Sequence, residues 1–372
     1  MSNQAAWIKE AKAYPFQVGP APRRTPGPGE VVVKTKAIAL HASKANMQLT
    51  LRRQLDFFNQ KYPFILGADI AGTVEEVGEG VTHVKNGQRV LGCVLVLHII
   101  STCPVIALFW VILISLSYCM GLGVNDPAFG AYQLYPTLHA SLVAPIPDDV
   151  DFVRASVLPL AITTVAVNLY HPDHLGLPLP SLTPKPTGKT LLVWGGSSSV
   201  GATAIQMAIA SGLEVVTTAS KRNHELVKSL GATAVFDYNS PTVVEDLLAD
   251  LSGRNVVAIS DAISEPESTK LIDAILATLG PRTVGMVVWP AVELSENFKP
   301  SMSLAFEILN DKGKEILEAV WKDWVPKALV TGQLQFKPDS VVVGEGLESL
   351  QSSLDKLKAG VSAQKLVVKI ES

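Results

Sequence analysis

Residues 190–210, TLLVWGGSSSVGATAIQMAIA, constrain the fold of this chain most, because an apolar run is followed by a glycine- and serine-rich turn and a second apolar run. The first run has the length of a buried strand, and the second has the length of a helix. A further strand-like run, LEVVTTAS, begins at Leu213. Strand, tight turn, helix and strand together form the βαβ unit of a parallel sheet. The sequence therefore predicts an α/β fold with a doubly wound parallel sheet.

The glycine-rich turn lies where a dinucleotide would bind. Glycines at a strand-to-helix turn let the backbone approach a pyrophosphate, whose charge meets free N–H groups and the positive end of the helix dipole. Ser198 occupies the usual place of the middle glycine, so we expect its hydroxyl to donate to the phosphate. The alternative is an ordinary turn capped by serines. The predicted phosphate-binding residues are Gly195, Gly196, Ser197, Ser198, Ser199, Val200 and Gly201.

The end of the second strand indicates which dinucleotide is bound. An NAD-specific site has an acidic residue about 20 residues after the glycines, where it holds the ribose hydroxyls. This chain instead has Ser220-Lys221-Arg222-Asn223, and Glu214 stands at the opposite end of that strand. Two cations and two polar side chains suit the 2′-phosphate of NADP. We therefore expect NADPH as the cofactor, with a solvated basic turn as the alternative.

The N-terminal part of the chain has a different pattern. GPGEVVVKTKAIAL (27–40) and PFILGADIAGTVEEVGEGVTHVKNGQRVLG (63–92) are short apolar runs broken by glycines. This pattern is typical of a compact β-barrel with tight corners. Near Asp151 the pattern becomes helical, and a proline-rich connector then leads to the βαβ units. The sequence therefore predicts two domains, with a boundary near residue 160.

Charge and cysteine content exclude some functions. The chain has 31 Lys and Arg against 34 Asp and Glu, so no basic surface for nucleic acid is expected. Its three cysteines, Cys93, Cys103 and Cys119, lie far apart on one apolar run and form no disulfide framework. The N-terminal residues, MSNQAAWIKEAKAYPF, carry charges where a signal peptide would be apolar. We expect a cytoplasmic protein.

Several segments together resemble one family. PGPGEVVVKTKAIAL, PFILGADIAGTVEEVGEG, GGSSSVG and GVSAQKLVVKI are similar to landmarks of the medium-chain dehydrogenase/reductase superfamily, in its zinc-independent branch of quinone and enoyl reductases. Within that branch, the chain is most similar to fungal trans-acting enoyl reductases and dehydrogenases of secondary-metabolite clusters. The resemblance implies a GroES-like catalytic domain from residues 1–160 and 317–372. It implies a Rossmann NADP-binding domain from residues 161–316, with the active site in the cleft.

The resemblance also bears on metal binding. Zinc-dependent members carry His-Glu after the glycine of PFILG, whereas this chain has Ala68-Asp69, and their upstream cysteine corresponds to a position near Ala42. A structural zinc needs four closely spaced cysteines. We expect no metal.

Four further site residues follow from the resemblance. His41 and Lys44 belong to His41-Ala42-Ser43-Lys44, which lies beside the nicotinamide where relatives have an Asn-Pro-Val-Asp-like run. Lys44 is the candidate catalytic residue, as a proton donor or enolate stabiliser, and a solvated lysine is the alternative. Tyr238 matches a tyrosine near the adenosine phosphate, or is a half-buried strand tyrosine. Lys365 approaches the cofactor from the barrel side, or is a surface lysine.

The implied activity is hydride transfer from NADPH to the activated C=C bond of an enoyl, polyketide-like substrate, followed by protonation of the enolate. The expected partners are a small-molecule enoyl, ketone or quinone substrate and a polyketide synthase. A quinone reductase is the alternative enzyme. A regulatory protein that binds NADPH without turnover is the alternative from another class.

One segment does not fit this pattern. Residues 94–118 carry no charge and are long enough to cross a bilayer as a helix. They interrupt the predicted barrel, and we interpret roughly 94–120 as a translated intron. The alternatives are a membrane anchor, which would place the enzyme at a membrane, and a buried insertion.

Overall fold

The computed structural model describes residues 2–10, 13–41, 62–95, 126–290 and 292–370. The chain divides into two compact units. The first contains Met1–Leu160, Asp339–Val361 and Lys365–Ser372, and the second contains Ala161–Pro338 and Ser362–Gln364. The chain therefore returns to the first unit at Asp339, whereas the sequence analysis placed this return at residue 317. Beyond Leu95, the predicted insertion at 94–120 lies outside the described residues.

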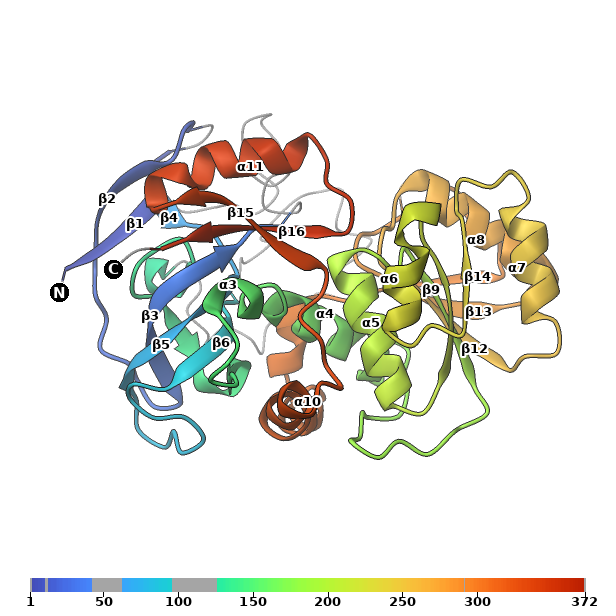
Figure 1. Cartoon of the computed structure of the whole chain (residues 1–372), viewed down its shortest axis with the longest axis horizontal. Helices are drawn as coiled ribbons and strands as arrows, with labels where there is room; N and C mark the ends of the chain where they lie inside the picture. Colours follow the sequence, from blue (N-terminus) through green and yellow to red (C-terminus); the bar gives the residue numbers. More distant parts are fainter. Residues whose placement is uncertain (1, 11–12, 42–61, 96–125, 291, 371–372) are drawn as a thin grey trace. The chain divides into compact units, whose positions relative to one another are not determined.

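The first unit is built from antiparallel strands. One sheet has the order β15-β16-β3-β5-β6-β8, with β7 pairing β3, and a smaller sheet has the order β2-β1-β4. In Figure 1, β3, β5 and β6 lie side by side, and their registers are antiparallel. The strands are β1 (Asn3–Ile8), β2 (Gln17–Ala21), β3 (Glu30–Ala39), β4 (Phe64–Ile65), β5 (Asp69–Val77), β6 (Arg89–Cys93), β7 (Thr137–His139), β8 (Val143–Pro145), β15 (Asp339–Glu345) and β16 (Gln364–Lys369).

Apolar side chains from the whole length of this unit fill its core. Strand β3 contributes Val31, Val33 and Ile38, while the C-terminal part of the chain contributes Leu354 and Val368. Because the C-terminal strand β16 pairs with β3, both ends of the chain are needed to close this core. The helices of the unit are η3 (Pro127–Phe129), η4 (Ala140–Leu142), α3 (Phe152–Ala155), η8 (Leu347–Ser349) and α11 (Leu350–Lys358).

The second unit contains a parallel sheet in the order β11-β10-β9-β12-β13-β14. Every strand pair in it is parallel. The first strand in sequence, β9, lies between β10 and β12, so the strand order reverses at its carboxyl end, which is where ligands bind in such sheets. The predicted α/β fold with a doubly wound sheet is confirmed. The strands are β9 (Thr190–Trp194), β10 (Glu214–Thr218), β11 (Ala234–Phe236), β12 (Val256–Asp261), β13 (Arg282–Met286) and β14 (Phe298–Met302).

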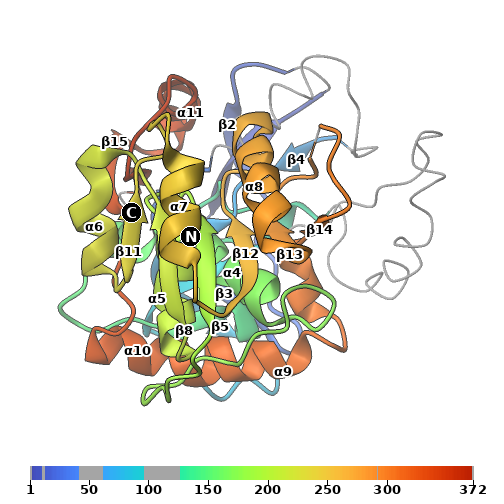
Figure 2. The ribbon, with the colours of Figure 1, turned by 90° about the vertical axis from the view of Figure 1, so that its right-hand side faces the viewer.

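Helices cover the parallel sheet. Helices α7 and α8 lie side by side in Figure 2, and they bury Leu247 and Ile272 in one apolar cluster with Leu192 of β9 and Ile259 of β12. The helices of this unit are α4 (Pro159–Tyr170), α5 (Ser199–Ala210), η5 (Lys221–Asn223), α6 (His224–Ser229), α7 (Val243–Leu251), α8 (Pro266–Leu279), η6 (Ala305–Leu309), α9 (Lys314–Leu317), η7 (Glu318–Trp324) and α10 (Val325–Thr331).

One helical stretch in the described part of the chain, Phe152–Tyr170, is long and apolar enough to cross a membrane. Most of it is buried within the fold. Its apolar character is therefore explained by packing in the protein interior.

Candidate functional site

The predicted phosphate loop lies between β9 and α5 and requires glycine at three positions. Gly195 has φ +80°, and a side chain there would meet Ile263. An added Cβ at Gly196 would lie 2.2 Å from Thr217 Oγ1, and one at Gly201 would lie 2.2 Å from the Gly195 carbonyl oxygen. At these three positions the backbone therefore runs against its neighbours with no room for a side chain.

Ser198 caps helix α5. Its Oγ accepts a hydrogen bond of 3.0 Å from the Gly201 N–H. The sequence predicts that this hydroxyl binds the phosphate, with a serine cap as the alternative. The cap is present, and because a hydroxyl can accept and donate at once, the Ser198 O–H still has a proton to donate.

The start of helix α5 has the polar groups that a phosphate needs. The Ser199 Oγ atom is buried without a hydrogen-bond partner, and the first turn has no acidic residue. The first N–H groups of a helix have no carbonyl one turn earlier to receive them, and they carry the positive end of the helix dipole. The loop therefore fits the pyrophosphate of a dinucleotide.

The basic turn follows β10 as a short helix, η5. Lys221 and Arg222 are exposed, and neither forms an ion pair with another described residue. Asn223 has a different role, because its Nδ2 donates to Ser197 Oγ at 3.3 Å, Ser220 Oγ at 3.1 Å and Ser362 Oγ at 3.1 Å. The turn therefore presents two cations, while Asn223 connects it to the phosphate loop.

Tyr238 lies just beyond the carboxyl end of β11, with 42% of its surface exposed. The predicted alternative was a half-buried tyrosine within the strand. Tyr238 lies outside the strand, at the carboxyl edge of the sheet where the phosphate loop also lies.

A buried carboxyl group at the end of β12 was missed by the sequence analysis. Asp261 accepts hydrogen bonds from the N–H groups of Ile263 and Ser264 and from Ser268 Oγ, at 2.9–3.0 Å. Burial raises its pKa. Ser264 has φ +55°, and its Oγ accepts from the Val287 N–H at 3.1 Å, which joins this loop to the end of β13. An aspartate in the apolar run NVVAISDAI was the available signal, since a buried carboxyl needs partners.

The first unit contains a second cluster, made of His41, Asp69 and Lys365. The Lys365 Nζ atom lies 3.3 Å from Asp69 Oδ2 and 3.1 Å from each ring nitrogen of His41. His41 Nε2 is also hydrogen-bonded to Asp69 Oδ2, and the Leu160 N–H donates to Asp69 Oδ1 at 2.6 Å. The Asp69 side chain is 0% exposed, that of Lys365 5% and that of His41 13%. The three charged or polar groups are thus withdrawn from water together.

Burial and neighbouring charges shift the pKa values of this cluster in opposite directions. Burial alone would raise the pKa of Asp69, but His41, Lys365 and the Leu160 N–H hold it below its usual value. Burial lowers the pKa of Lys365, and attraction to Asp69 offsets only part of that effect. Asp69 is therefore a stable carboxylate that faces two bases.

The structure places the predicted residues of the first unit as follows. His41 and Lys365, which are far apart in sequence, come together, and the interpretation of Lys365 as a surface lysine is wrong because the side chain is buried. Asp69 was noted in the sequence only as a departure from the zinc pattern. Its position in the apolar run PFILGADIAG was the signal that it has a buried partner. Lys44 lies outside the described residues.

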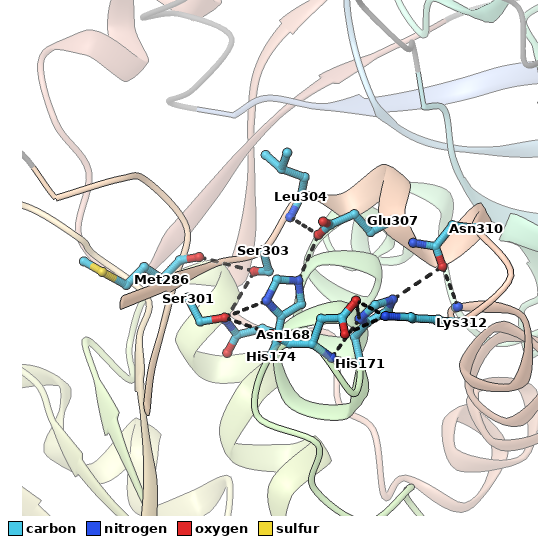
Figure 3. A network of polar contacts seen from close by, with 12 residues as sticks. Asn168, His171, His174, Met286, Ser301, Ser303, Leu304, Glu307, Asn310 and Lys312 are labelled. Atoms are coloured by element: carbon cyan, nitrogen blue, oxygen red, sulfur yellow. Dashed lines mark hydrogen bonds and ion pairs between the residues drawn. The ribbon is translucent and has the colours of Figure 1, made fainter. Parts of the chain in front are cut away.

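A third polar network, in the second unit, joins the turn after helix α4 to β14 and η6 (Figure 3). His174 Nδ1 lies 2.7 Å from Ser301 Oγ, and its Nε2 lies 2.9 Å from Glu307 Oε2. Lys312 forms an exposed ion pair of 2.7 Å with Asp173. Each of these groups has a protein partner, which indicates a structural role for the network.

In the part of the chain that the structure describes, no group of three or more His, Cys, Asp or Glu side chains could hold a metal ion. In the first unit, the Lys365 ammonium contacts both His41 and Asp69. A cation already lies against these two potential ligands, so they do not fit a zinc site.

Comparison with known proteins agrees with the two-unit architecture. Residues 27–148 match the alcohol dehydrogenase GroES-like domain, and residues 199–315 match the zinc-binding dehydrogenase family. The trans-enoyl reductase himH of Aspergillus japonicus is 39% identical over 371 residues, which cover 99% of this chain and 97% of that protein.

Two solved structures share the fold. The CurK enoyl reductase aligns with a TM-score of 0.71 at 18% identity and covers 99% of both chains. A mycobacterial protein solved in complex with NADPH aligns with a TM-score of 0.65 at 22% identity, covering 99% of this chain and 100% of that one.

Proposed function

The chain belongs to the medium-chain dehydrogenase/reductase superfamily, and from that premise we propose that it is an NADPH-dependent enoyl reductase. The observation that carries the proposal is the glycine-rich loop at the start of α5, with Lys221 and Arg222 at the end of the adjacent strand. A loop of this kind binds the pyrophosphate of a nicotinamide dinucleotide.

The choice of NADPH rests on the basic turn. The 2′-phosphate of NADP is doubly charged near neutral pH, and an arginine can bind it in a bidentate manner. Residues 220–223 themselves contain no carboxylate. In this proposal Gly195–Gly201 hold the pyrophosphate, Lys221 and Arg222 hold the 2′-phosphate, and Tyr238 lies against the adenosine end. When bound, NADPH supplies the hydride.

We propose that the reaction proceeds without zinc. At the position where zinc-dependent members carry a ligand pair, this chain has Ala68 and Asp69. Asp69 is fully engaged by Lys365, His41 and the Leu160 N–H, so its oxygens are already committed to hydrogen bonds and ion pairs. The chain must therefore stabilise the enolate with its own charged and polar groups.

The substrate class follows from the relatives. Both himH and CurK are enoyl reductases by name, so we propose an enoyl, polyketide-like substrate in fungal secondary metabolism, with a polyketide synthase as the partner that presents it. A quinone is the competing electron acceptor.

The purified full chain would be mixed with NADPH or NADH and with enoyl thioesters, ketones or quinones, and cofactor oxidation would be followed at the nicotinamide absorbance. We expect oxidation of NADPH with enoyl thioesters, and slower oxidation of NADH. A preference for quinones would identify a quinone reductase. Binding of NADPH without oxidation across the panel would identify a cofactor-binding protein without turnover.

A further inference from the structure

The turn after β12, residues 262–265, lies against the phosphate loop, and one buried carboxyl group determines its shape. We propose that Asp261 is a positioning residue of the cofactor site: it fixes this turn, and the turn holds Gly195 in the conformation that receives the pyrophosphate. The carboxyl group acts as an acceptor of hydrogen bonds and is not needed for its charge. This inference rests on the proposed binding of NADPH by Gly195–Gly201.

The turn contacts the phosphate loop through two consecutive residues. The Ala262 N–H donates to the Trp194 carbonyl oxygen at 3.1 Å, and Trp194 directly precedes Gly195. Ile263 lies beside Gly195 itself, because a Cβ added to Gly195 would be 2.4 Å from Ile263 Cγ1. Gly195 has φ +80°, a conformation that residues with a side chain rarely adopt. A backbone hydrogen bond and a close apolar approach thus hold the chain where it turns from β9 towards α5.

The Asp261 carboxyl group sets the backbone of the turn. Its Oδ1 accepts hydrogen bonds from the N–H groups of Ile263 at 3.0 Å and Ser264 at 2.9 Å. Its Oδ2 accepts a hydrogen bond from Ser268 Oγ at 3.0 Å. One oxygen thus holds two consecutive N–H groups, and the first of them belongs to the residue that lies beside Gly195. Removal of this acceptor would leave both N–H groups to find another partner, at a cost in free energy.

Ser264 joins the same turn to a third strand. Its Oγ accepts a hydrogen bond of 3.1 Å from the N–H of Val287, the residue directly after β13. The Ser264 hydroxyl donates to the Asp261 carbonyl oxygen at 3.0 Å. The turn therefore connects the carboxyl ends of β9, β12 and β13, and in a doubly wound sheet this edge binds the ligand. We therefore expect a change in the turn to alter cofactor binding.

The Asp261 carboxyl group has hydrogen-bond donors around it but no counter-ion. Asp261 is 0% exposed and forms no ion pair with any residue that the structure describes. Burial raises its pKa, the carboxylate of Glu265 raises it further, and the hydrogen bonds from the turn offset only part of this effect. A negative charge here would also oppose the charge of a bound pyrophosphate. An amide would supply the same Oδ1 acceptor without the charge, so Asp261→Asn separates positioning from electrostatics.

The NADPH affinity of the purified full chain, measured by fluorescence titration, tests this assignment. For Asp261→Ala we expect the affinity to fall about tenfold, because two N–H groups of the turn lose their acceptor. For Asp261→Asn we expect an affinity within about twofold of the wild-type value, because the amide oxygen accepts the same two hydrogen bonds. Ser268→Ala removes only the contact to Oδ2 and is the milder variant if Asp261→Ala does not fold; we expect a fall of about threefold.

Asp273→Ala is the matched control. The Asp273 carboxylate, on α8, also accepts hydrogen bonds from a backbone N–H and a serine hydroxyl, both of Ser295, at 3.1 and 2.6 Å. Ser295 lies just before β14, at the amino edge of the parallel sheet and so opposite the phosphate loop. We expect wild-type NADPH affinity from Asp273→Ala.

The contact between Ile263 and Gly195 is tested by a double variant. Ile263→Ala removes the side chain that lies beside Gly195. If Asp261 acts through this residue, Ile263→Ala combined with Asp261→Ala should lower NADPH affinity by less than the product of the two single effects.

Three results would overturn the assignment. They are wild-type NADPH affinity in Asp261→Ala, an equal loss of affinity in Asp261→Asn and Asp261→Ala, and a double variant whose loss equals the product of the single losses. If the wild-type protein binds no NADPH at all, the proposed function fails instead. Amide hydrogen exchange of the cofactor-free protein then tests the positioning role by itself. We expect faster exchange in residues 195–201 for Asp261→Ala than for Asp273→Ala, and equal exchange in the two variants would contradict that role.

Discussion

The phosphate loop and the buried charge cluster are built in opposite ways. The loop, Gly195–Gly201, is contiguous in sequence and works through its backbone, since each of its glycines is required by a close approach. The cluster brings together His41, Asp69 and Lys365 from β-rich segments far apart in sequence, and it works through side-chain charge. A contiguous motif can be recognised before the fold is known. A cluster of buried charges leaves a weaker signal in the sequence. A charged residue in an apolar segment indicates that a buried partner exists, because burial of an unpaired charge is costly, but it does not identify that partner.

The largest effect should come from the cluster. Asp69→Asn removes the carboxylate that faces Lys365 and His41 and leaves a buried cation without its counterion. Breaking a buried ion pair in this way costs about 3–5 kcal/mol. We expect the free energy of unfolding in urea at pH 7 to fall by about that amount.

The surface ion pair between Asp173 and Lys312 is the matched control for that substitution. Both side chains are more than half exposed, and Lys312 Nζ lies 2.7 Å from Asp173 Oδ2. Exposed pairs contribute about 0–1 kcal/mol, so Asp173→Asn should have little effect. If Asp69→Asn and Asp173→Asn lowered the free energy of unfolding equally, the cluster would contribute no more to stability than a surface ion pair.

A change to the loop should act on cofactor binding. At Gly201 a Cβ would lie 2.2 Å from the Gly195 carbonyl oxygen, so Gly201→Val forces the start of α5 away from the loop. Forced packing of this kind costs about 1–3 kcal/mol, and we expect NADPH affinity measured by fluorescence titration to fall tenfold or more. Gly19→Val is the control, because nothing lies within 4 Å of its Cβ position. NADPH affinity equal to that of the wild-type protein in Gly201→Val would place the cofactor elsewhere.

As the pH falls, the stabilising contribution of the charge cluster should decrease before the phosphate loop is affected. The folded pKa of Asp69 lies below the ordinary value of 3.8, so its carboxylate contributes stability that is fully present above about pH 4. As the pH falls, the Asp69 carboxyl is protonated first in the unfolded state. The contribution is lost as the pH falls through the pKa of the folded state. In urea titrations between pH 7 and pH 3, the stability gap between wild type and Asp69→Asn should therefore narrow at the acidic end. A gap that stays constant over this range would contradict the assignment of an ionised Asp69.

The glycine loop could be predicted from the sequence, whereas the partners of the buried charged residues could not. The parallel sheet, the glycine loop and the basic turn follow from local patterns, because strand period, turn chemistry and helix caps are set by neighbouring residues. Lys365 was assigned a surface alternative because its partner Asp69 lies in a strand almost 300 residues earlier. Asp261 and Ser264 were missed for a similar reason, since their hydrogen bonds join the ends of β12 and β13.

The proposed preference for NADPH should depend on the two cations of the basic turn. Both are exposed, so solvent screens them and each contributes modestly. We expect Lys221→Ala combined with Arg222→Ala to raise KM for NADPH by about tenfold, or about 1.4 kcal/mol, while KM for NADH stays the same. Lys228→Ala, an exposed lysine of α6 paired with Glu225, is the control. An equal rise in KM for NADPH and NADH would mean that the turn does not bind the 2′-phosphate.

Substitution of Asn223 tests whether cofactor binding by the loop depends on residues outside Gly195–Gly201. Its amide donates to Ser197 in the loop, to Ser220 at the end of β10 and to Ser362 near the C-terminus. Each neutral hydrogen bond contributes about 0.5–1.5 kcal/mol, and water can replace part of it in a half-exposed site. We therefore expect Asn223→Ala to weaken NADPH binding only about threefold, with Asn239→Ala, an exposed asparagine that bonds locally to Asp237, as the control. A loss as large as that of the double cation variant would mean that the loop depends on a residue 26 positions away from Ser197, and the contrast with the charge cluster would then be one of degree.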